Sequence, residues 1–399
     1  MAFIRKRGDA YQIRVSCGYD IKGKQIYQSM TWRPDEGMTP KQIERELNRQ
    51  AVFFEENCLS KGQITANVKF EEFAKEWFEE YAKLNLRSTT YARVSQLTQR
   101  VYPAIGHMRL DRITGRHIQH FVNDMSLNGK SMKTGEPLSR KTVIHHLSFI
   151  SDVFNYAVKM GMIADNPCRC VSVPKGEKKE KDIYTIEEIE QIFNLLENEP
   201  LKYRVFFTLA IYSGFRRGEM LGLEWKDIDW TNGVITVKRT SNYTKERGIY
   251  TDTTKTKKSK RSLKFPPVVM DLLRKYKEEQ EEWVAALGDK WNGNGRLFVK
   301  LNGEPMNPQT PYGWFKDDFC EKNGLRFCDI HSLRHFNASV LINAGVDVAA
   351  VSRALGHSCV GTTTNIYCHV FQQAQTRTSE AIATALDFSK KTEQDKEAS

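Results

Sequence analysis

The hydrophobic positions near the start of the chain follow two different periods. Residues 11–17 alternate between apolar and polar side chains, and residues 25–32 alternate again after a turn that contains Gly23, which is the period of half-buried strands. Thr39 and Pro40 mark a helix start. The apolar face of that helix consists of Ile43, Leu47, Ala51 and Phe54. The pattern predicts a small N-terminal sheet, interpreted as a hairpin, followed by one helix.

From about residue 66 to residue 175 the pattern is helical. One apolar helix face is formed by Phe70, Phe73, Ala74, Trp77 and Tyr81. Further helices are predicted over residues 113–125 and 138–158, on either side of a glycine-containing polar stretch. The charged segment 174–182 has no large apolar side chain, which is typical of an exposed linker.

The third region mixes helices with short strands. Thr185 and Glu188 form a capping box before an apolar helix face, and the next helix stops at Ser213-Gly214. Strands are predicted over 234–237, near 248–254 and near 262–265, with the last two flanking a basic hairpin tip. Residues from 266 to about 386 fit further helices.

These patterns together predict a mainly α protein with small β-sheets (α+β) and several domains. The predicted limits are 1–62 for the sheet domain, 66–173 for a helical bundle, 183–386 for a mixed α/β domain and 387–399 for a polar tail.

Composition and charge narrow the class of protein. The 399 residues include 60 Lys and Arg against 49 Asp and Glu, and this excess favours a polyanionic partner such as nucleic acid. No apolar run approaches the roughly 20 residues of a membrane span. The first residues lack the apolar stretch of a secretory signal, so we expect a cytoplasmic protein that does not bind a membrane. The eight cysteines, without a CxxC pair, are expected to be reduced thiols.

The first 33 residues are strongly basic, with seven basic and two acidic side chains. A small sheet that presents Arg14 and Gln28 outward would fit a DNA groove. A solvated sheet face is the plainer alternative.

Five short patterns in the third region share one chemistry. They are SGFRRGEML with Arg216, TKTKKSKR with Lys255, HSLRH with His331 and Arg334, LGH with His357, and NIYCH with Tyr367. Arginine, lysine and histidine can bind or protonate phosphate oxygens, and a tyrosine hydroxyl can act as a nucleophile. His357 follows Arg334 by 23 residues and Tyr367 follows His357 by ten. This joint spacing is a far stronger signal than any one pattern.

The set strongly resembles the tyrosine recombinase family, also called the phage integrase family. Segment 331–370 is most similar to integrases of conjugative transposons, and the resemblance covers nearly the whole chain. It implies an arm-site DNA-binding domain at 1–62 with a three-stranded sheet and a helix, a helical core-binding domain at 66–173 and a mixed α/β catalytic domain at 183–386. Ser332 stands where the family often has Asp, and Phe336 where it often has Thr or Ser. Neither position carries a chemical role, so we expect catalysis to be kept.

The resemblance implies a catalytic set of Arg216, Lys255, His331, Arg334, His357 and Tyr367. Tyr367 would attack a DNA phosphate and become 3′-phosphotyrosyl, while the two arginines clamp the non-bridging oxygens. The lysine would protonate the leaving 5′ oxygen, His331 would do acid–base work and His357 would hold the phosphate. No cofactor and no metal is expected, because the arginines neutralise the charge.

Some of these residues also have plainer interpretations. Taken alone, Tyr367 in its apolar surroundings fits a half-buried core tyrosine. His357 after a glycine fits a helix cap. Arg216 and Arg217 could both pair with acids such as Glu219, and we expect this pairing above all for Arg217.

Other lysine and histidine residues are candidates for a catalytic or metal-binding role. Lys257 is the main rival of Lys255, and a solvated basic loop is the plainer interpretation of both. His335 is interpreted as structural. His117 and His120 have a spacing that would fit metal ligands but is far more typical of a helix surface.

The implied function is a site-specific recombinase that integrates and excises a mobile genetic element. The alternatives are a type IB topoisomerase, which relaxes supercoils as a monomer, and a non-catalytic architectural DNA-binding protein. The implied partners are double-stranded DNA with core and arm sites and further copies of the chain in a homo-tetramer on two DNA sites; an excision factor is left open. Residues 381–388 are predicted to form a docking helix toward a neighbouring copy.

Overall fold

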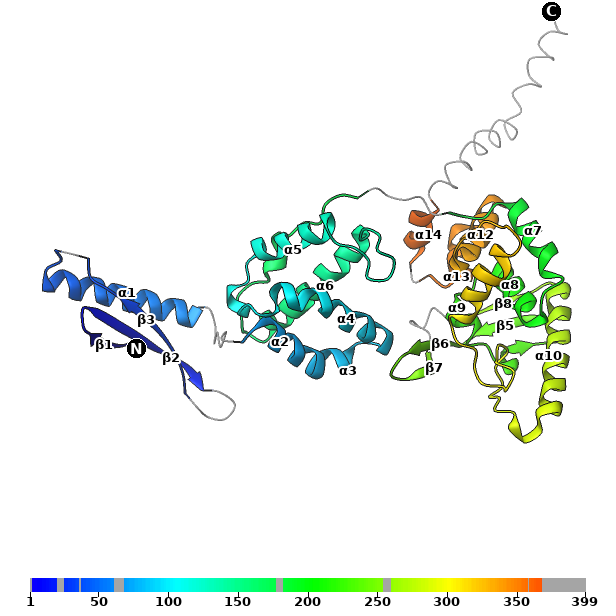
Figure 1. Cartoon of the computed structure of the whole chain (residues 1–399), viewed down its shortest axis with the longest axis horizontal. Coiled ribbons are helices and arrows are strands. Elements are labelled where there is room, and N and C mark those ends of the chain that lie inside the picture. The colour runs from blue at the N-terminus through cyan, green and yellow to red at the C-terminus, as the bar shows by residue number, and fades with distance from the viewer. Residues whose placement is uncertain are drawn as a thin grey trace, which may run out of the picture. The chain divides into compact units, whose positions relative to one another are not determined.

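The computed structural model describes residues 2–19, 25–35, 37–60, 68–176, 182–253, 260–357 and 359–367. The chain divides into two compact units, Met1–Lys178 and Lys179–Ser399 (Figure 1). The division falls inside the charged segment 174–182. Among the described residues, the structure contains no helix with the length and apolar character needed to cross a bilayer.

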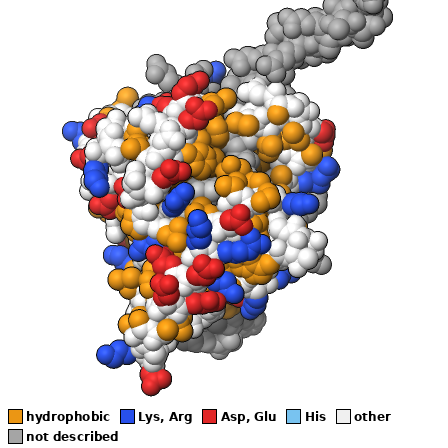
Figure 2. Space-filling model, turned by 90° about the vertical axis from the view of Figure 1, so that its right-hand side faces the viewer, with side chains coloured by type: hydrophobic (Ala, Val, Ile, Leu, Met, Phe, Trp, Pro, Cys, Tyr) orange, Lys and Arg blue, Asp and Glu red, His pale blue; other side chains and the backbone are white. Residues whose placement is uncertain are grey.

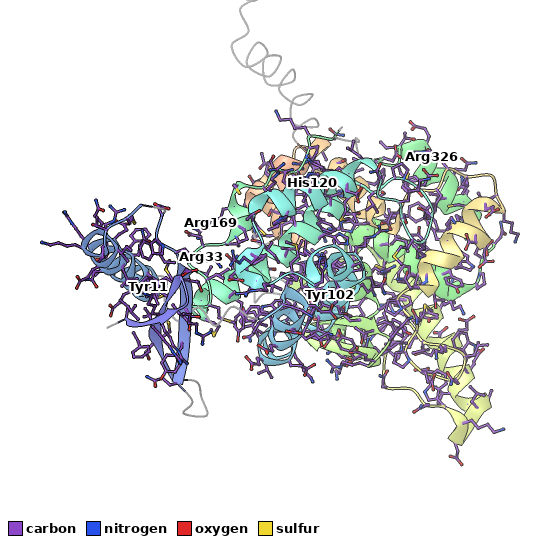
Figure 3. All side chains as sticks on the ribbon, turned by 60° about the vertical axis from the view of Figure 1, so that its left-hand side comes forward. Tyr11, Arg33, Tyr102, His120, Arg169 and Arg326 are labelled. Atoms are coloured by element: carbon purple, nitrogen blue, oxygen red, sulfur yellow. The ribbon has the colours of Figure 1, made fainter. Side chains whose placement is uncertain are left out.

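An antiparallel sheet opens the first unit. Its strands lie in the order β1 (Phe3–Arg7), β2 (Ala10–Tyr19) and β3 (Gln25–Trp32), and one helix, α1 (Pro40–Ser60), follows them. Buried Ile13 of β2 packs against Leu47 and Ala51 of α1. Tyr11, labelled in Figure 3, adds its ring to this small core, 6.0 Å from the ring of Trp32. Every second strand residue faces the helix, which explains the alternation in the sequence.

The outward face of this sheet differs from the prediction at one position. Arg14 is exposed, and its guanidinium lies 3.6 Å from the centre of the Tyr27 ring. Gln28 pairs across the strands with buried Val15, and its Oε1 accepts a hydrogen bond from the Cys58 thiol of α1 at 3.4 Å. The prediction that Gln28 points outward is therefore wrong. The strand register places it on the opposite face from Arg14.

A helical bundle completes the first unit. Its elements are α2 (Phe70–Trp77), η1 (Phe78–Ala82), α3 (Lys83–Asn85), α4 (Ser88–Val101), η2 (Tyr102–Gly106), η3 (Leu110–Arg112), α5 (Gly115–Leu127), α6 (Arg140–Lys159) and η4 (Pro167–Cys170). Aromatic rings, including those of Trp77, Phe149 and Phe154, fill its core. This core accounts for the helical spacing of apolar side chains in the sequence.

The histidine pair of the bundle belongs to a helix start and a helix surface. His117 Nδ1 accepts a hydrogen bond from the backbone N–H of Thr114 at 3.1 Å and so caps α5. His120 is exposed on the same helix (Figure 3).

The second unit surrounds a buried helix with further helices and short strands. Its elements are α7 (Ile186–Leu196), α8 (Leu201–Ser213), α9 (Arg217–Met220), η5 (Trp225–Asp227), β4 (Ile228–Asp229), β5 (Val234–Val237), β6 (Arg239–Thr244), β7 (Gly248–Thr253), β8 (Arg261–Lys264), α10 (Pro267–Leu287), η7 (Gly288–Lys290), α11 (Thr310–Gly313), η8 (Trp314–Glu321), α12 (Ile330–Asn343), α13 (Val348–Leu355) and α14 (Val360–Ile366). The predicted fold class, mainly helical with small antiparallel sheets, is confirmed.

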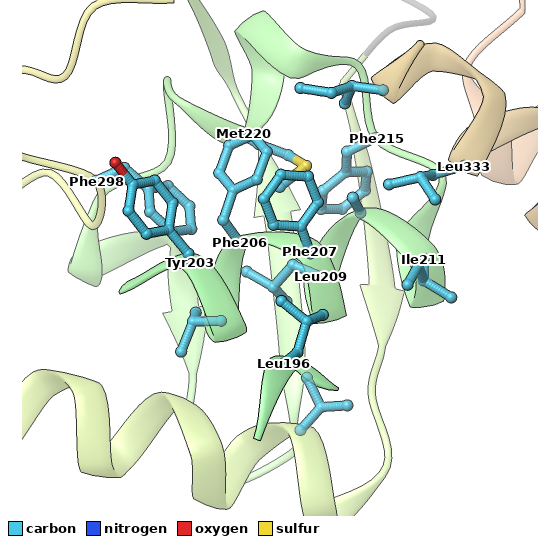
Figure 4. Close-up of a cluster of buried hydrophobic side chains, with 14 of the residues drawn as sticks. Leu196, Tyr203, Phe206, Phe207, Leu209, Ile211, Phe215, Met220, Phe298 and Leu333 are labelled. Atoms are coloured by element: carbon cyan, nitrogen blue, oxygen red, sulfur yellow. The ribbon is translucent and has the colours of Figure 1, made fainter. Parts of the chain in front are cut away.

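Helix α8 is the centre of this unit. Most of its side chains are buried, and Figure 4 shows Phe206, Phe207 and Leu209 among the core residues. Figure 2 shows acidic and basic side chains interspersed with hydrophobic ones on the side of the unit that carries α10. Mixed charges of this kind are typical of a solvated surface rather than of one that attracts a polyanion.

The strands around the basic run belong to two different sheets. β7 pairs with β6, from Arg239 opposite Thr253 to Thr244 opposite Gly248, whereas β8 pairs with β5. The prediction of one hairpin with the basic run at its tip is therefore wrong, because the two strands that flank the run have different partners. Lys255 and Lys257 lie outside the described residues.

Candidate active site

A helix stop positions the first arginine of the site. α8 ends at Gly214, whose φ of 60° lies in the left-handed region that glycine adopts without strain. A Cβ at this position would lie 2.8 Å from Leu355 Cδ2, so the approach of α13 also requires glycine. Arg216 follows as the N-cap of α9 and donates from Nη2 to the carbonyl of Gly356 at 3.0 Å.

Glu219 fixes the orientation of Arg216. The backbone N–H of Arg216 donates to Glu219 Oε2 at 2.9 Å, and Nη1 donates to Oε1 at 2.8 Å. Arg217 does not take part and donates to Gln309 Oε1 at 3.2 Å. The prediction that Arg217 pairs with Glu219 is wrong, because the third residue of a helix turns back over the N-cap rather than over the residue after it.

Arg334 is the most buried cation of the site, with 3% of its surface exposed. Its Nη1 donates to the carbonyl of Gly214 at 2.6 Å. Its Nη2 is buried and has no hydrogen-bond partner among the described residues. Burial and the nearby charge of Arg216 lower the pKa of Arg334 to about 9. A buried donor without a partner costs free energy, and an anionic ligand at Nη2 would recover it.

His357 follows a second helix stop. α13 ends at Gly356, which has a left-handed φ of 66°. The ring of His357 is tied through Nδ1 to Thr363 Oγ1 at 2.8 Å. Burial and the charges of Arg334 and Arg216 lower the pKa of His357 to about 4, so the ring is neutral at pH 7. In the tautomer whose Nδ1 accepts from the Thr363 hydroxyl, the ring proton is on Nε2, which can then donate to an oxyanion.

His331 lies at the open side of the site. It is exposed at the start of α12, and its backbone N–H donates to Asp329 Oδ1 at 3.4 Å. A pocket of about 350 Å³ is lined by His331 together with Arg216, Arg217 and Asp329. The pocket is thus open to solvent and rich in cationic groups.

Tyr367 lies inside the protein, after the last turn of α14. It is fully buried and packs in a small core with Ala338, Ile342, Val351 and Leu355. Its hydroxyl lies 2.6 Å from His335 Nδ1. Burial raises the pKa of Tyr367 to about 12, against an opposing effect of Arg334. The plainer interpretation of Tyr367 as a core tyrosine therefore fits its environment.

The structure brings together most of the predicted set. Arg216 lies close enough to lower the pKa of Arg334, both arginines lower the pKa of His357, and Tyr367 raises that of Arg334. His331 lines the same pocket as Arg216. Lys255 lies outside the described residues, so its place in the set stays a prediction.

Three residues that contact this set were not among its predicted members. Glu219 orients Arg216, Arg261 contacts Glu219, and His335 contacts Tyr367. Only Glu219 carried a local signal, since it stands at the third position after an N-cap. The other two are recognisable only from contacts with residues that are distant in the chain.

The arrangement of the two arginines and His357 can bind a phosphate. Two guanidinium groups and a neutral imidazole supply donors in a largely buried site, which is the kind of preorganised clamp that stabilises developing negative charge. Within the part of the chain that the structure describes, no three His, Cys, Asp or Glu side chains converge as metal ligands would.

Comparison with known families gives matches over both units. The phage integrase family matches residues 183–374, and the phage integrase N-terminal SAM-like domain matches residues 69–126. A tyrosine recombinase XerC-like protein of Caldanaerobacter subterraneus is 27% identical, over 95% of this chain and 97% of its own length. The ICEBs1 integrase of Bacillus subtilis is 26% identical, over 93% of this chain and 96% of its own length.

Solved structures share the fold. The Tn1549 transposon integrase in complex with transposon right end DNA has a TM-score of 0.67 at 20% identity, over 78% of this chain and 99% of its own. Lambda integrase, as a tetramer bound to a Holliday junction, has a TM-score of 0.56 at 17% identity, over 92% of this chain and 94% of its own.

Proposed function

The chain belongs to the phage integrase family of tyrosine recombinases, which cut and rejoin DNA, and on this premise we propose that Tyr367 is its nucleophile. The protein is a site-specific recombinase that integrates and excises a mobile genetic element. In the proposal, Arg216, Arg334 and His357 bind the scissile phosphate of double-stranded DNA.

The observation that carries the proposal is the buried Nη2 of Arg334. This nitrogen has no partner among the described residues, while Nη1 of the same guanidinium is held by the carbonyl of Gly214. The guanidinium is thus fixed through Nη1, while Nη2 is available to donate to a non-bridging phosphate oxygen. Arg216 is held in a similar way by Glu219 and supplies the second charge.

The proposed reaction is a reversible transesterification. The Tyr367 oxygen attacks the phosphorus and forms a 3′-phosphotyrosyl bond, while the bond between phosphorus and the 5′ oxygen breaks. The proposal assigns Lys255 to protonate the departing 5′ oxygen and His331 to move protons at the tyrosine or the phosphate. Attack by a 5′ hydroxyl from a second duplex reverses the step without ATP, because the phosphodiester energy is kept in the intermediate.

The first unit is proposed to add DNA contacts. Residues 1–62 would bind arm sites through the outward face of the sheet, where Arg14 stacks on Tyr27. Residues 66–173 would bind the core site, and residues 183–386 would carry the chemistry. A basic face with an aromatic ring supports contact with nucleic acid.

A homo-tetramer on two DNA sites completes the proposal. Lambda integrase, which shares the fold, is described as a tetramer on a Holliday junction. The predicted docking helix 381–388 lies outside the described residues. An excision factor would act on this assembly by favouring one direction of the reaction.

Covalent trapping tests the proposal. Wild type, Tyr367→Phe and the control Tyr243→Phe are incubated with nicked DNA that carries the core sequence from the ends of the element. Tyr243 is 45% exposed on β6 and is not a member of the predicted catalytic set. We expect a denaturation-resistant adduct with wild type and with the control only. An adduct that persists in Tyr367→Phe would place the nucleophile elsewhere.

Two further readouts separate the alternatives. Joining of strands from two duplexes distinguishes a recombinase from a topoisomerase, which would only relax supercoils. Tight binding without any adduct would favour an architectural DNA-binding protein.

A further inference from the structure

The proposed nucleophile is shielded from solvent in the free chain. Tyr367 has 0% of its surface exposed, and its ring packs between side chains of α12 and α13. A hydroxyl that water cannot touch cannot be touched by a phosphate oxygen of DNA either. Attack requires the tyrosine oxygen and the phosphorus to approach to within about 3–3.5 Å of each other. Tyr367 must therefore leave this position before it can react.

Among the described residues, a polar contact with His335 helps to hold the tyrosine in its buried position. The hydroxyl of Tyr367 lies 2.6 Å from Nδ1 of His335, and the two ring centres are 5.6 Å apart at an angle of 61°. His335 is itself 5% exposed, on the buried side of α12. Because burial raises the pKa of Tyr367 to about 12, its hydroxyl keeps the proton at pH 7 and can donate it to Nδ1 in the tautomer that carries its proton on Nε2.

We infer that His335 is a positioning residue that holds Tyr367 in this inactive, buried place until DNA binds. The inference rests on the proposed function for the role of Tyr367 as nucleophile. Breaking the contact would leave a buried hydroxyl without a partner, so the hydrogen bond adds to the packing that retains the ring. The tyrosine is thereby kept from phosphates that are not bound in the site.

The neighbouring residue explains how DNA could release the contact. Arg334 precedes His335 on α12, and its open Nη2 is the proposed phosphate donor. A phosphate bound at Nη2 gives the tyrosine oxygen a target close to the helix that retains it. Tyr367 then exchanges its hydrogen bond with His335 for a position in line with the phosphorus.

The contact with Tyr367 would also fit His335 as a general base. A general base and a positioning residue predict opposite effects of removing His335 on the rate of DNA cleavage. A base that takes the tyrosine proton would contribute about 10²–10⁴-fold to the cleavage rate. A residue that only retains the buried tyrosine would not slow cleavage when removed, and cleavage would become faster if release limits the rate.

Two variants separate the hydrogen bond from the volume of the ring. His335→Phe keeps an aromatic ring in the core but cannot accept the hydroxyl proton. His335→Asn loses volume but keeps a polar atom near the position of Nδ1. His335→Gln places its amide nearer to the position of Nε2, so it removes the same contact with a different side chain if the Phe variant does not fold.

Nitration of the free protein with tetranitromethane, followed by peptide mass spectrometry, reports the exposure of Tyr367. Within the same sample, Tyr243 at 45% exposure and Tyr276 at 0% are the open and buried references. We expect Tyr367 to react as slowly as Tyr276 in wild type and His335→Asn. In His335→Phe we expect about tenfold faster nitration. This change follows if the variant loses about 1.4 kcal/mol of the free energy that favours the buried position of Tyr367 over an exposed one. Nitration at the wild-type rate would overturn the inference.

Adduct formation on nicked core DNA, measured in a single turnover at matched DNA occupancy, gives the second readout. We expect His335→Phe to form the adduct at the wild-type rate or up to about tenfold faster. A fall of a hundredfold or more would overturn the inference and make His335 a catalytic base. Failure of wild type to form any adduct would contradict the proposed function instead, while the nitration result would still report on the contact.

Discussion

Arg261 and Glu219 form a buried ion pair in which Nη2 of the arginine lies 2.8 Å from Oε2 of the carboxylate. The other carboxylate oxygen binds Arg216 at 2.8 Å, and Nε of Arg261 donates to the carbonyl of Ala354 at 2.6 Å. One side chain of β8 therefore links α9, which carries the first arginine of the clamp, to the end of α13, which precedes His357. The geometry of the clamp depends on this pair.

Removing Arg261 should destabilise the second unit. In Arg261→Met the buried carboxylate of Glu219 loses one of its two cationic partners, and breaking a buried pair in this way typically costs about 3–5 kcal/mol. Urea unfolding would measure the loss. The matched control is Arg274→Met, which removes an exposed pair with Asp271 on α10 and should change the free energy of unfolding by less than about 1 kcal/mol. Equal effects of the two variants would contradict the role of the buried pair.

Arg334→Lys should slow DNA cleavage although it keeps the positive charge. A single ammonium group cannot both occupy the position of Nη1 at the Gly214 carbonyl and reach a phosphate from the position of Nη2. Loss of one preorganised donor typically lowers the rate by about 10²–10³-fold. The single-turnover rate of adduct formation at saturating DNA would show this. Arg217→Lys, which alters a contact with Gln309 outside the clamp, should cleave at nearly the wild-type rate.

The low pKa of His357 should make the protein less stable in mild acid. The folded pKa of about 4 lies below the usual 6.5, so between these values the unfolded chain binds a proton that the folded chain does not. The free energy of unfolding therefore falls as pH drops from about 6.5 toward 4, by less than about 1.4 kcal/mol per pH unit for this one group. Urea unfolding at pH 7 and pH 5 would measure it. His357→Gln should show a smaller fall between the two pH values than wild type, and an unchanged fall would contradict this origin.

Arg14→Gln should weaken binding to arm-site DNA. Arg14 is exposed on the outward face of the N-terminal sheet, where its guanidinium lies over Tyr27. Loss of one phosphate contact should lower the slope of log K against log salt by about 1. Titrations of arm and core duplexes at several salt concentrations would test this. Arg49→Gln, on the helix α1, is the control, and an equal loss in both variants would argue for a diffuse charge effect.

Local sequence patterns predicted the element types and the residues of the candidate site. Side-chain alternation marked the strands of the first sheet, and the 3.6-residue period marked the helices, because both periods arise from the backbone geometry of a single element. The glycines after α8 and α13 could likewise be interpreted as stops before Arg216 and His357. The spacing of Arg334, His357 and Tyr367 identified the family.

Partners that are distant in the chain could not be predicted in this way. Gln28 faces the helix because of the register between β2 and β3, which the sequence pattern of either strand leaves open. β7 and β8 join different sheets, although only a short basic run separates them. The sequence by itself pointed to the side chains that we propose carry the chemistry and to the apolar faces of the helices, since those follow from residue type and local period. Only the tertiary structure decided that Arg261 ties β8 to α13 and that His335 contacts Tyr367, because such contacts arise when packing brings separate elements to within a hydrogen bond of each other.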